Sequence, residues 1–242
     1  MFGFLTHHLP EDFFQGVCDI HCHLLPGVDD GFSTKGKSLQ ALEWLGERGV
    51  SKMILTPHFM KEYADNDRNS IKAIFETFKA EAAKVSGIEL RLAAEYMLDA
   101  RFIEHFRQGF LALDGDKHVL CETSYMMYEP HATEMLYEIM LEGFQPVIAH
   151  PERYEYASKG NYAKWKDKRY KFQLNLLSLS GAYGSMAKAK AHYLLEEGMY
   201  DYVGTDMHNL DNFIRNSGAI KLSSKDINRV VALFDNNKKL FR

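Results

Sequence analysis

Two short motifs place metal-ligating side chains two residues apart. They are His21-Cys22-His23 and Asp206-Met207-His208. In an extended chain, residues i and i+2 lie on the same face, so both outer members of each motif can reach one ion. The central residue of each motif alternates to the opposite face, and we interpret it as a packing residue. Imidazole and carboxylate together suit Zn, Mn or Fe, and no thiolate is needed.

Four more potential ligands follow or end other predicted strands. They are His58, Glu95, Glu122 and His150. In a parallel barrel the chemistry lies at the carboxyl ends of the strands, where all eight residues would gather from six strands. Each one alone has an ordinary explanation as a surface pair, a solvated strand end or a helix cap, but their joint placement favours a metal centre. The other histidines have no partner at ligand spacing, and we expect them to be structural: His7 and His8 in a tail, His105, His118, His131 and His192.

Hydrophobic patterning predicts seven strands that alternate with helices. The predicted strands are residues 17–21, 50–57, 88–95, 118–123, 145–150, 172–176 and 200–206. The predicted helices are residues 34–49, 69–87, 101–108, 130–143, 161–168, 185–198 and 225–240, with Ser33 or Thr34, Asn69 and Ser224 as caps. This alternation predicts an α/β fold with a parallel sheet covered by helices, and seven units suit a single-domain barrel better than an open sheet.

Composition excludes several classes of protein. The 242 residues carry a net charge of -4 from 33 acids and 29 bases, so we expect no nucleic-acid partner. The longest apolar runs are far shorter than the roughly 20 residues that a spanning helix needs, so we expect no membrane insertion. The first 16 residues have no basic region or cleavage site typical of a signal peptide. Three cysteines without a CxxC pair predict reduced thiols in a cytoplasmic protein.

Nucleophilic side chains in the usual arrangements are missing from the sequence. A thiol-based tyrosine phosphatase needs an arginine six residues after its cysteine, but Cys18, Cys22 and Cys121 are followed at that distance by Leu24, Val28 and Met127. The sequence also has no GxSxG motif, which a serine hydrolase of the α/β type would carry. The sequence therefore excludes the thiol mechanism and shows no sign of a serine hydrolase of this type.

Four segments together resemble the PHP (polymerase and histidinol phosphatase) superfamily. They are Asp-Ile-His-Cys-His (19–23), Thr-Pro-His (56–58), Ala-His-Pro-Glu-Arg-Tyr (149–154) and Gly-Thr-Asp-Met-His-Asn (204–209). Together with Leu-Pro-Gly-Val-Asp-Asp-Gly (25–31), they are similar to the bacterial tyrosine-protein phosphatases of capsule and exopolysaccharide loci, the CpsB/YwqE type. The resemblance covers roughly residues 17–210. It implies a distorted (β/α)7 TIM-like barrel over residues 17–242, preceded by an N-terminal extension of residues 1–16.

The resemblance also implies a site with three divalent metal ions, manganese being the expected metal and iron or zinc the alternatives. By that resemblance, one ion would be held by His21, His23, Glu95 and Asp206. Glu95 would bridge to a second ion completed by Glu122 and His150. The third ion would be held by Asp30, His58 and His208. Arg153 would face the substrate phosphate, and an alternative for it is a surface pair with Glu152 or Glu155.

The implied activity is hydrolysis of phosphotyrosine in proteins by a metal-activated hydroxide, with the tail of a capsule-locus tyrosine kinase as the expected substrate. Asp206 and His208 are candidates for protonating the leaving phenolate. The alternatives are another phosphoesterase of the superfamily, such as a histidinol-phosphate phosphatase, or a metal-stabilised binding module without activity. Five aromatic residues either wall an aromatic substrate or pack in the body of the fold: Phe59, Tyr125, Tyr128, Tyr154 and Tyr156.

Overall fold

The computed structural model describes residues 5–241, and its strands run mainly in parallel. Six strands form one parallel sheet, in the order β10 (Tyr202–Gly204), β9 (Lys171–Asn175), β8 (Gln145–Ala149), β7 (His118–Glu122), β6 (Glu95–Met97) and β4 (His58–Phe59). Three more form a second parallel sheet, in the order β2 (Cys18–Asp19), β3 (Lys52–Leu55) and β5 (Glu89–Leu92). The predicted parallel α/β architecture is therefore confirmed.

Two stretches of the chain each contribute a strand to both sheets. The predicted strand of residues 50–57 contains β3 and ends just before β4, and the predicted strand of residues 88–95 contains β5 and only the first residue of β6. Pro57 lies between β3 in one sheet and β4 in the other. It has no N–H to donate to a neighbouring strand, although its carbonyl accepts from the Glu95 N–H at 3.1 Å. The remaining edges meet through a parallel bridge between Cys22 and Met207.

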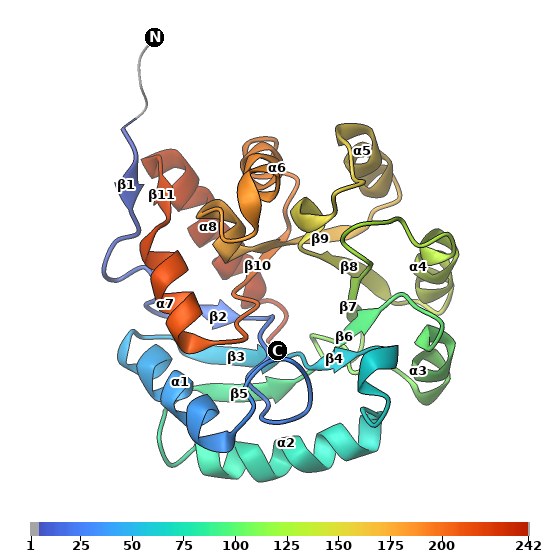
Figure 1. Ribbon diagram of the computed structural model, residues 1–242, viewed down its shortest axis with the longest axis horizontal. Coiled ribbons are helices and arrows are strands. Elements are labelled where there is room, and N and C mark those ends of the chain that lie inside the picture. The colour runs from blue at the N-terminus through green and yellow to red at the C-terminus, as the bar shows by residue number, and fades with distance from the viewer. Residues whose placement is uncertain (1–4, 242) are drawn as a thin grey trace.

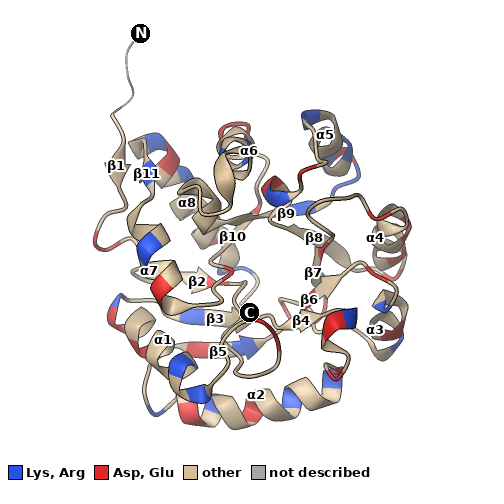
Figure 2. Ribbon diagram, viewed as in Figure 1, with Lys and Arg blue, Asp and Glu red and all other residues tan. Residues whose placement is uncertain are grey.

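Helices lie around the outside of the strands (Figure 1). They are α1 (Lys35–Glu47), α2 (Arg68–Ala82), α3 (Phe102–Gln108), α4 (Ala132–Leu141), α5 (Lys159–Asp167), α6 (Gly184–Glu196), α7 (Leu210–Gly218) and α8 (Ser224–Asn237). Short 3₁₀ turns add η1 (Lys61–Tyr63), η2 (Pro151–Arg153) and η3 (Leu176–Leu179). Acidic and basic residues are interspersed on these helices (Figure 2). Among residues 5–241, no helix is both long and apolar enough to cross a bilayer.

The helix caps test the predicted boundaries. Thr34 caps α1 as predicted. Asn69 and Ser224 are wrong as caps, because Asp67 caps α2 through a capping box with Ser70, and Ser223 caps α8. In both cases an acceptor side chain one or two residues earlier already satisfies the first free N–H groups of the helix.

Two parts of the structure were not predicted. Helix α7, capped by Asn209, follows the last motif directly. His7 and His8 were expected in a tail, but they form β1 (His7–His8), which pairs antiparallel with β11 (Lys221–Leu222). Next to this pair, Phe13 and Phe14 are buried, and their rings contact those of Phe234 and Phe213 respectively. The extension is thus attached to the body of the fold through β1 and the buried rings of Phe13 and Phe14.

The core has an inner and an outer part. The inner part consists of strand residues such as Cys18, Ile20, Ile54 and Leu120, together with Leu240 and Phe241 from the C-terminal end. Lys52, the first residue of β3, places its Nζ 4.9 Å from the Phe241 ring. The C-terminal residues therefore fill the space between the amino ends of the strands, which leaves the carboxyl ends to form the site.

Candidate metal centre

The structure brings the predicted ligands together at the carboxyl ends of the strands. Three groups of donor atoms converge there: His21, His23, Glu95 and Asp206; His23, Asp30, His58 and His208; and His58, Glu95 and Glu122. His150 completes the set, since its Nε2 lies 3.0 Å from Glu95 Oε1 and 3.8 Å from Glu122 Oε2. Within residues 5–241, the six other histidines lie outside these groups, as expected.

The first group has the dimensions of a metal cage. His21 Nε2 lies 3.2 Å from His23 Nε2, 3.1 Å from Glu95 Oε2 and 3.4 Å from Asp206 Oδ1. His23 Nε2 lies 3.4 Å and 3.3 Å from the same two oxygens. Donors that each lie about 2.0 Å from one ion in a tetrahedral arrangement are about 3.3 Å apart. The observed spacing therefore fits a single divalent ion among these four residues.

The proton positions of the two histidines support the same conclusion. His21 Nδ1 donates to Gln173 Oε1 at 2.8 Å, and His23 Nδ1 donates to Asp29 Oδ2 at 2.9 Å. In the neutral imidazoles the two Nε2 atoms then carry lone pairs that face each other and two carboxylates. Positive charge between these atoms relieves the repulsion. Histidines that bind metals through one ring nitrogen are commonly held by a hydrogen bond from the other, as His21 and His23 are here.

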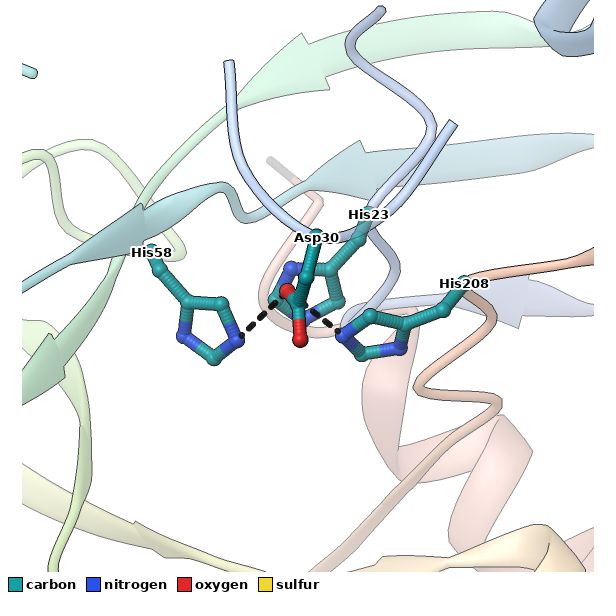
Figure 3. A group of neighbouring side chains, drawn as sticks. All are labelled: His23, Asp30, His58 and His208. Carbon is teal, nitrogen blue, oxygen red and sulfur yellow. Dashed lines mark ion pairs between the residues drawn. The ribbon is translucent and has the colours of Figure 1, made fainter. Parts of the chain in front are cut away.

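Asp30 connects the loop of residues 25–31 to the centre. Its Oδ1 lies 3.4 Å from His58 Nε2 and 3.3 Å from His208 Nε2, between the two rings (Figure 3). The loop can approach this closely because residue 31 is glycine: a Cβ there would lie 2.2 Å from the carbonyl oxygen of His23. The neighbouring Asp29 accepts from the backbone N–H of His58 at 3.1 Å.

His58 faces two of the three groups. Its Nδ1 lies 3.2 Å from Glu95 Oε2 and 3.0 Å from Glu122 Oε1, while its Nε2 faces Asp30. Those two carboxylate oxygens and His58 Nδ1 are buried without a hydrogen-bond partner in the structure, as is His150 Nδ1. Buried polar atoms rarely lack a partner, so this arrangement also fits metal ligation. The predicted division of the nine residues among three ions stays a prediction.

Among residues 5–241, three non-glycine residues have positive φ, and two of them, His150 and Asp206, are predicted ligands; the third, Arg169, lies in the turn before β9. His150 has φ 32° and ψ 55°, although it precedes Pro151 and such residues favour extended backbone. Asp206 has φ 50°. Strained non-glycine residues are held in place only where the surrounding structure requires it, and they cluster at functional sites. Here the strain turns both side chains towards the centre at the strand ends.

The electrostatics of the centre favour positive charge. Burial lowers the pKa of His21, but Glu95 and Asp206 raise it, with a net result of about 9. Burial raises the pKa of the Asp206 carboxyl, yet the charge of His21 and the hydrogen bond from His23 hold it well below its usual range. A divalent cation would take the place of the protons that the imidazoles otherwise attract.

Arg153 lies in the site and not in a surface pair. Its Nη1 donates to Asp206 Oδ2 at 2.7 Å, and its guanidinium lies 4.3 Å from the ring centre of Tyr125 and 4.1 Å from that of Tyr183. Glu152 is buried elsewhere, where it accepts from Ser178 and Tyr200. Arg153 thus borders a cavity of about 320 Å³ with Asp30, His58, Tyr125, Tyr183, Asp206 and His208.

Sequence reasoning missed the residues that hold this arrangement. Gln173 and Asn175, both fully buried, project from β9, and Asn175 Nδ2 donates to Asp206 Oδ2 at 2.7 Å and to the Tyr183 hydroxyl at 3.1 Å. The signal was present in Phe-Gln-Leu-Asn-Leu (172–176), where amide side chains alternate with apolar ones in a buried strand. Gly204 on the adjacent strand is also required, since a Cβ there would lie 2.5 Å from His21 Cβ.

The candidate aromatic residues have different roles. Tyr125 lines the cavity, and its hydroxyl donates to Glu122 Oε2 at 3.3 Å. Phe59 and Tyr154 are each 1% exposed and pack in the core. Tyr156 stacks on Tyr154, and Tyr128 contacts Tyr156. Tyr125 therefore lines the cavity together with two aromatic residues that were not predicted, Tyr183 and Phe213.

The three cysteines are buried free thiols. Burial raises the pKa of Cys18 to about 12 and that of Cys22 well above its usual value. Cys22 and Met207 pack in the outer core, as the alternation of the two motifs predicted, and Cys121 lies there too. Since the thiolate is the reactive form, none of the three is set up as a nucleophile.

The fold and the site together define an α/β protein with a histidine–carboxylate centre able to bind divalent metal ions. Residues 17–229 match the family model described as capsular polysaccharide synthesis, CpsB/CapC. The chain belongs to this family.

Relatives with curated names agree with this assignment. The tyrosine-protein phosphatase YwqE of Bacillus subtilis is 27% identical over 203 residues, covering 80% of this chain and 78% of YwqE. The tyrosine-protein phosphatase CpsB of Streptococcus agalactiae is 28% identical over 208 residues, covering 81% and 84%. The resemblance found in the sequence motifs is therefore confirmed.

Solved structures share the fold. A chain from the crystal structures of YwqE from Bacillus subtilis and CpsB from Streptococcus pneumoniae, described as unique metal-dependent tyrosine phosphatases, has a TM-score of 0.78 at 23% identity, with 93% and 94% of the two chains covered. The phosphotriesterase homology protein of Escherichia coli has a TM-score of 0.57 at 14% identity, with 95% and 99% covered.

Metal content is the first testable property of the centre. We expect protein saturated with Mn²⁺ and then desalted to retain up to three ions per chain, measured by elemental analysis. Gln173→Leu should lower metal affinity by about 10- to 100-fold, because it removes the acceptor that orients His21. The exposed change Gln40→Leu on α1 serves as a control. Retention of one ion or none by the wild-type protein would contradict the three-ion centre.

The cysteines give a second prediction. We expect Cys18→Ser, Cys22→Ser and Cys121→Ser to keep most of any phosphatase activity, because their thiols are buried and protonated. The measurement is turnover of p-nitrophenyl phosphate with metal content determined on the same samples. Loss of turnover in a folded variant with unchanged metal content would reopen a thiol mechanism.

Proposed function

We propose that this protein is a metal-dependent protein-tyrosine phosphatase. One observation carries the proposal. Residues of the metal-binding groups, Arg153 and the two tyrosine rings that contact Arg153 all line the same cavity. The curated names of its relatives describe the same activity.

The nine residues His21, His23, Asp30, His58, Glu95, Glu122, His150, Asp206 and His208 would hold three divalent ions, with manganese as the expected metal. When bound, such ions lower the pKa of a water towards neutrality and neutralise charge on phosphoryl oxygens. Glu95 suits a bridging role, because its Oε2 faces His21 while its Oε1 faces His150.

The protein's own residues would bind and orient the substrate. Arg153 keeps N–H donors beyond the one on Asp206, and it can direct them at two phosphoryl oxygens. Tyr125 and Tyr183 fix the plane of its guanidinium and offer their ring edges to the phenyl group of phosphotyrosine. His208, 29% exposed in its side chain, and the more deeply buried Asp206 remain the candidates for protonating the leaving phenolate.

The proposal extends to the substrate, the cellular location and the closure of the barrel. The expected substrate is a phosphotyrosine-bearing tail of a tyrosine kinase encoded at a capsule locus. The buried free thiols suit a cytoplasmic location. The Cys22–Met207 bridge supports a distorted barrel of seven units, because it joins the two sheets at their free edges.

A substrate panel tests the proposal. With added Mn²⁺, we expect the protein to hydrolyse a phosphotyrosine peptide faster than a phosphoserine peptide of the same sequence and faster than histidinol phosphate, and a chelator should abolish all turnover. Faster turnover of histidinol phosphate would favour the alternative phosphoesterase. Metal binding without turnover of any phosphomonoester would favour a binding module.

Arg153 gives a prediction within this function. Arg153→Ala should lower kcat/KM on a phosphotyrosine peptide by about 10²- to 10³-fold, since it removes a preorganised donor to the transition state. Arg153→Lys should recover little, because an ammonium cannot replace a planar group stacked between two rings.

Metal content separates this role from a structural one. Arg153→Ala should keep its metal ions, whereas His21→Ala should lose metal and activity together. Wild-type kinetics in Arg153→Ala would refute the phosphate-binding role and leave the metal centre unaffected.

A further inference from the structure

A second cavity adjoins the site cavity, and Tyr125 lines both. It has a volume of about 370 Å³ and lies between η1, the segment after β6 and the loop that joins β7 to α4. Its lining residues are Lys61, Glu62, Met97, Leu98, Asp99, Ser124, Tyr125, Met126 and Glu129. The segment after Pro57 also borders both cavities, with His58 on one side and Lys61 on the other.

The wall of this second cavity includes apolar side chains that solvent can reach. Met126 is 74% exposed, and the adjacent Met127 is 72% exposed. Met97 is half-buried and Leu98 is buried beneath the cavity. Exposed methionines beside a binding site adapt their shape to apolar groups of varied form. The cavity is therefore suited to a long aliphatic stem.

The charges of the lining are mainly negative. Three carboxylates, from Glu62, Asp99 and Glu129, accompany a single ammonium on Lys61. Asp99 accepts from the backbone N–H of Lys61 at 2.9 Å and of Arg101 at 2.8 Å, and the Lys61 ammonium lies 3.8 Å from Glu62. Glu129, at the end of the β7–α4 loop, adds a further negative charge at the rim. The site cavity next to it carries Arg153 and, with the metal ions of the proposed function bound, would favour an anionic phosphoryl group, so the two neighbouring cavities would then favour opposite charges.

We propose that the second cavity binds a lysine or arginine side chain of the substrate, two residues from the phosphotyrosine. This inference rests on the proposed function. In an extended segment, side chains two residues apart point to the same face about 7 Å apart, so both can enter adjacent cavities. The aliphatic stem contacts Met97 and Met126, and the cationic head faces Glu129. The protein thereby selects a basic, extended phosphotyrosine segment.

The test compares phosphotyrosine peptides that differ only at the positions two residues before and after the phosphotyrosine. Lysine, leucine, alanine and glutamate are placed at each position in turn, and free phosphotyrosine is measured alongside. We expect kcat/KM to fall in the order lysine, leucine, glutamate at one of the positions. The lysine-to-glutamate ratio should be about fivefold, the size expected for a partly exposed ion pair. Free phosphotyrosine does not reach the second cavity.

Charge reversal makes the test specific. Glu129→Lys should invert the order between lysine and glutamate peptides while leaving turnover of free phosphotyrosine unchanged. Glu138→Lys, an exposed change on α4 with the same net charge difference, should keep the wild-type order. Met126→Ala should reduce the advantage of lysine and leucine peptides over an alanine peptide, because it shortens the apolar wall.

The outcomes separate this inference from the function on which it rests. Turnover of all peptides with no preference at either position, or the same preference in Glu129→Lys and wild type, would overturn the basic subsite alone. Absence of turnover with free phosphotyrosine and every peptide would overturn the proposed function, and the subsite with it.

Discussion

The structure depends on one electrostatic constraint: five carboxylates and five imidazoles share a small, mostly buried volume at the strand ends. They are Asp29, Asp30, Glu95, Glu122 and Asp206 with His21, His23, His58, His150 and His208. Buried charge without a counter-charge is costly, and carboxylates beside lone-pair nitrogens repel each other. Divalent ions would resolve the conflict, and binding them would then stabilise the folded protein.

Other parts of the fold serve to hold this centre rigid. The backbone of Asp206 donates to the His21 carbonyl at 2.8 Å, and His23 donates to the Met207 carbonyl at 3.0 Å. These two bonds align the first motif with the last along a shared edge. Asp19 strengthens the same junction, since it accepts from the backbone and the hydroxyl of Thr205. The ligand pairs are thus positioned by the ends of strands and not by flexible loops, Asp30 excepted.

The sequence predicted which residues gather at the centre better than it predicted the residues that support them, and the reason is physical. The period of two in a strand made His21 and His23 recognisable as a pair, and the alternation of elements located the strand ends. The role of Asp29 was missed. It accepts a hydrogen bond from His23 Nδ1, and the sequence around Asp29 has no local pattern that predicts this contact. Strand β4, just beyond residues 50–57, and the break between β5 and β6 were not predicted for the same reason, because they depend on pairing with strands that are distant in the sequence. Helix α7 was missed because the sequence after Asn209 offered no recognised motif.

Asp206 connects the candidate metal centre with Arg153. Its Oδ1 faces the nitrogens of His21 and His23, while its Oδ2 accepts from Asn175 and Arg153, each at 2.7 Å. One carboxylate therefore positions a ligand group and the residue expected to bind phosphate. Asn175 also donates to the Tyr183 hydroxyl, so the ring that stacks on Arg153 is tied to the same point. A shift of Asp206 on metal binding would move the guanidinium with it, and full alignment of Arg153 with a phosphoryl group would then require a filled metal centre.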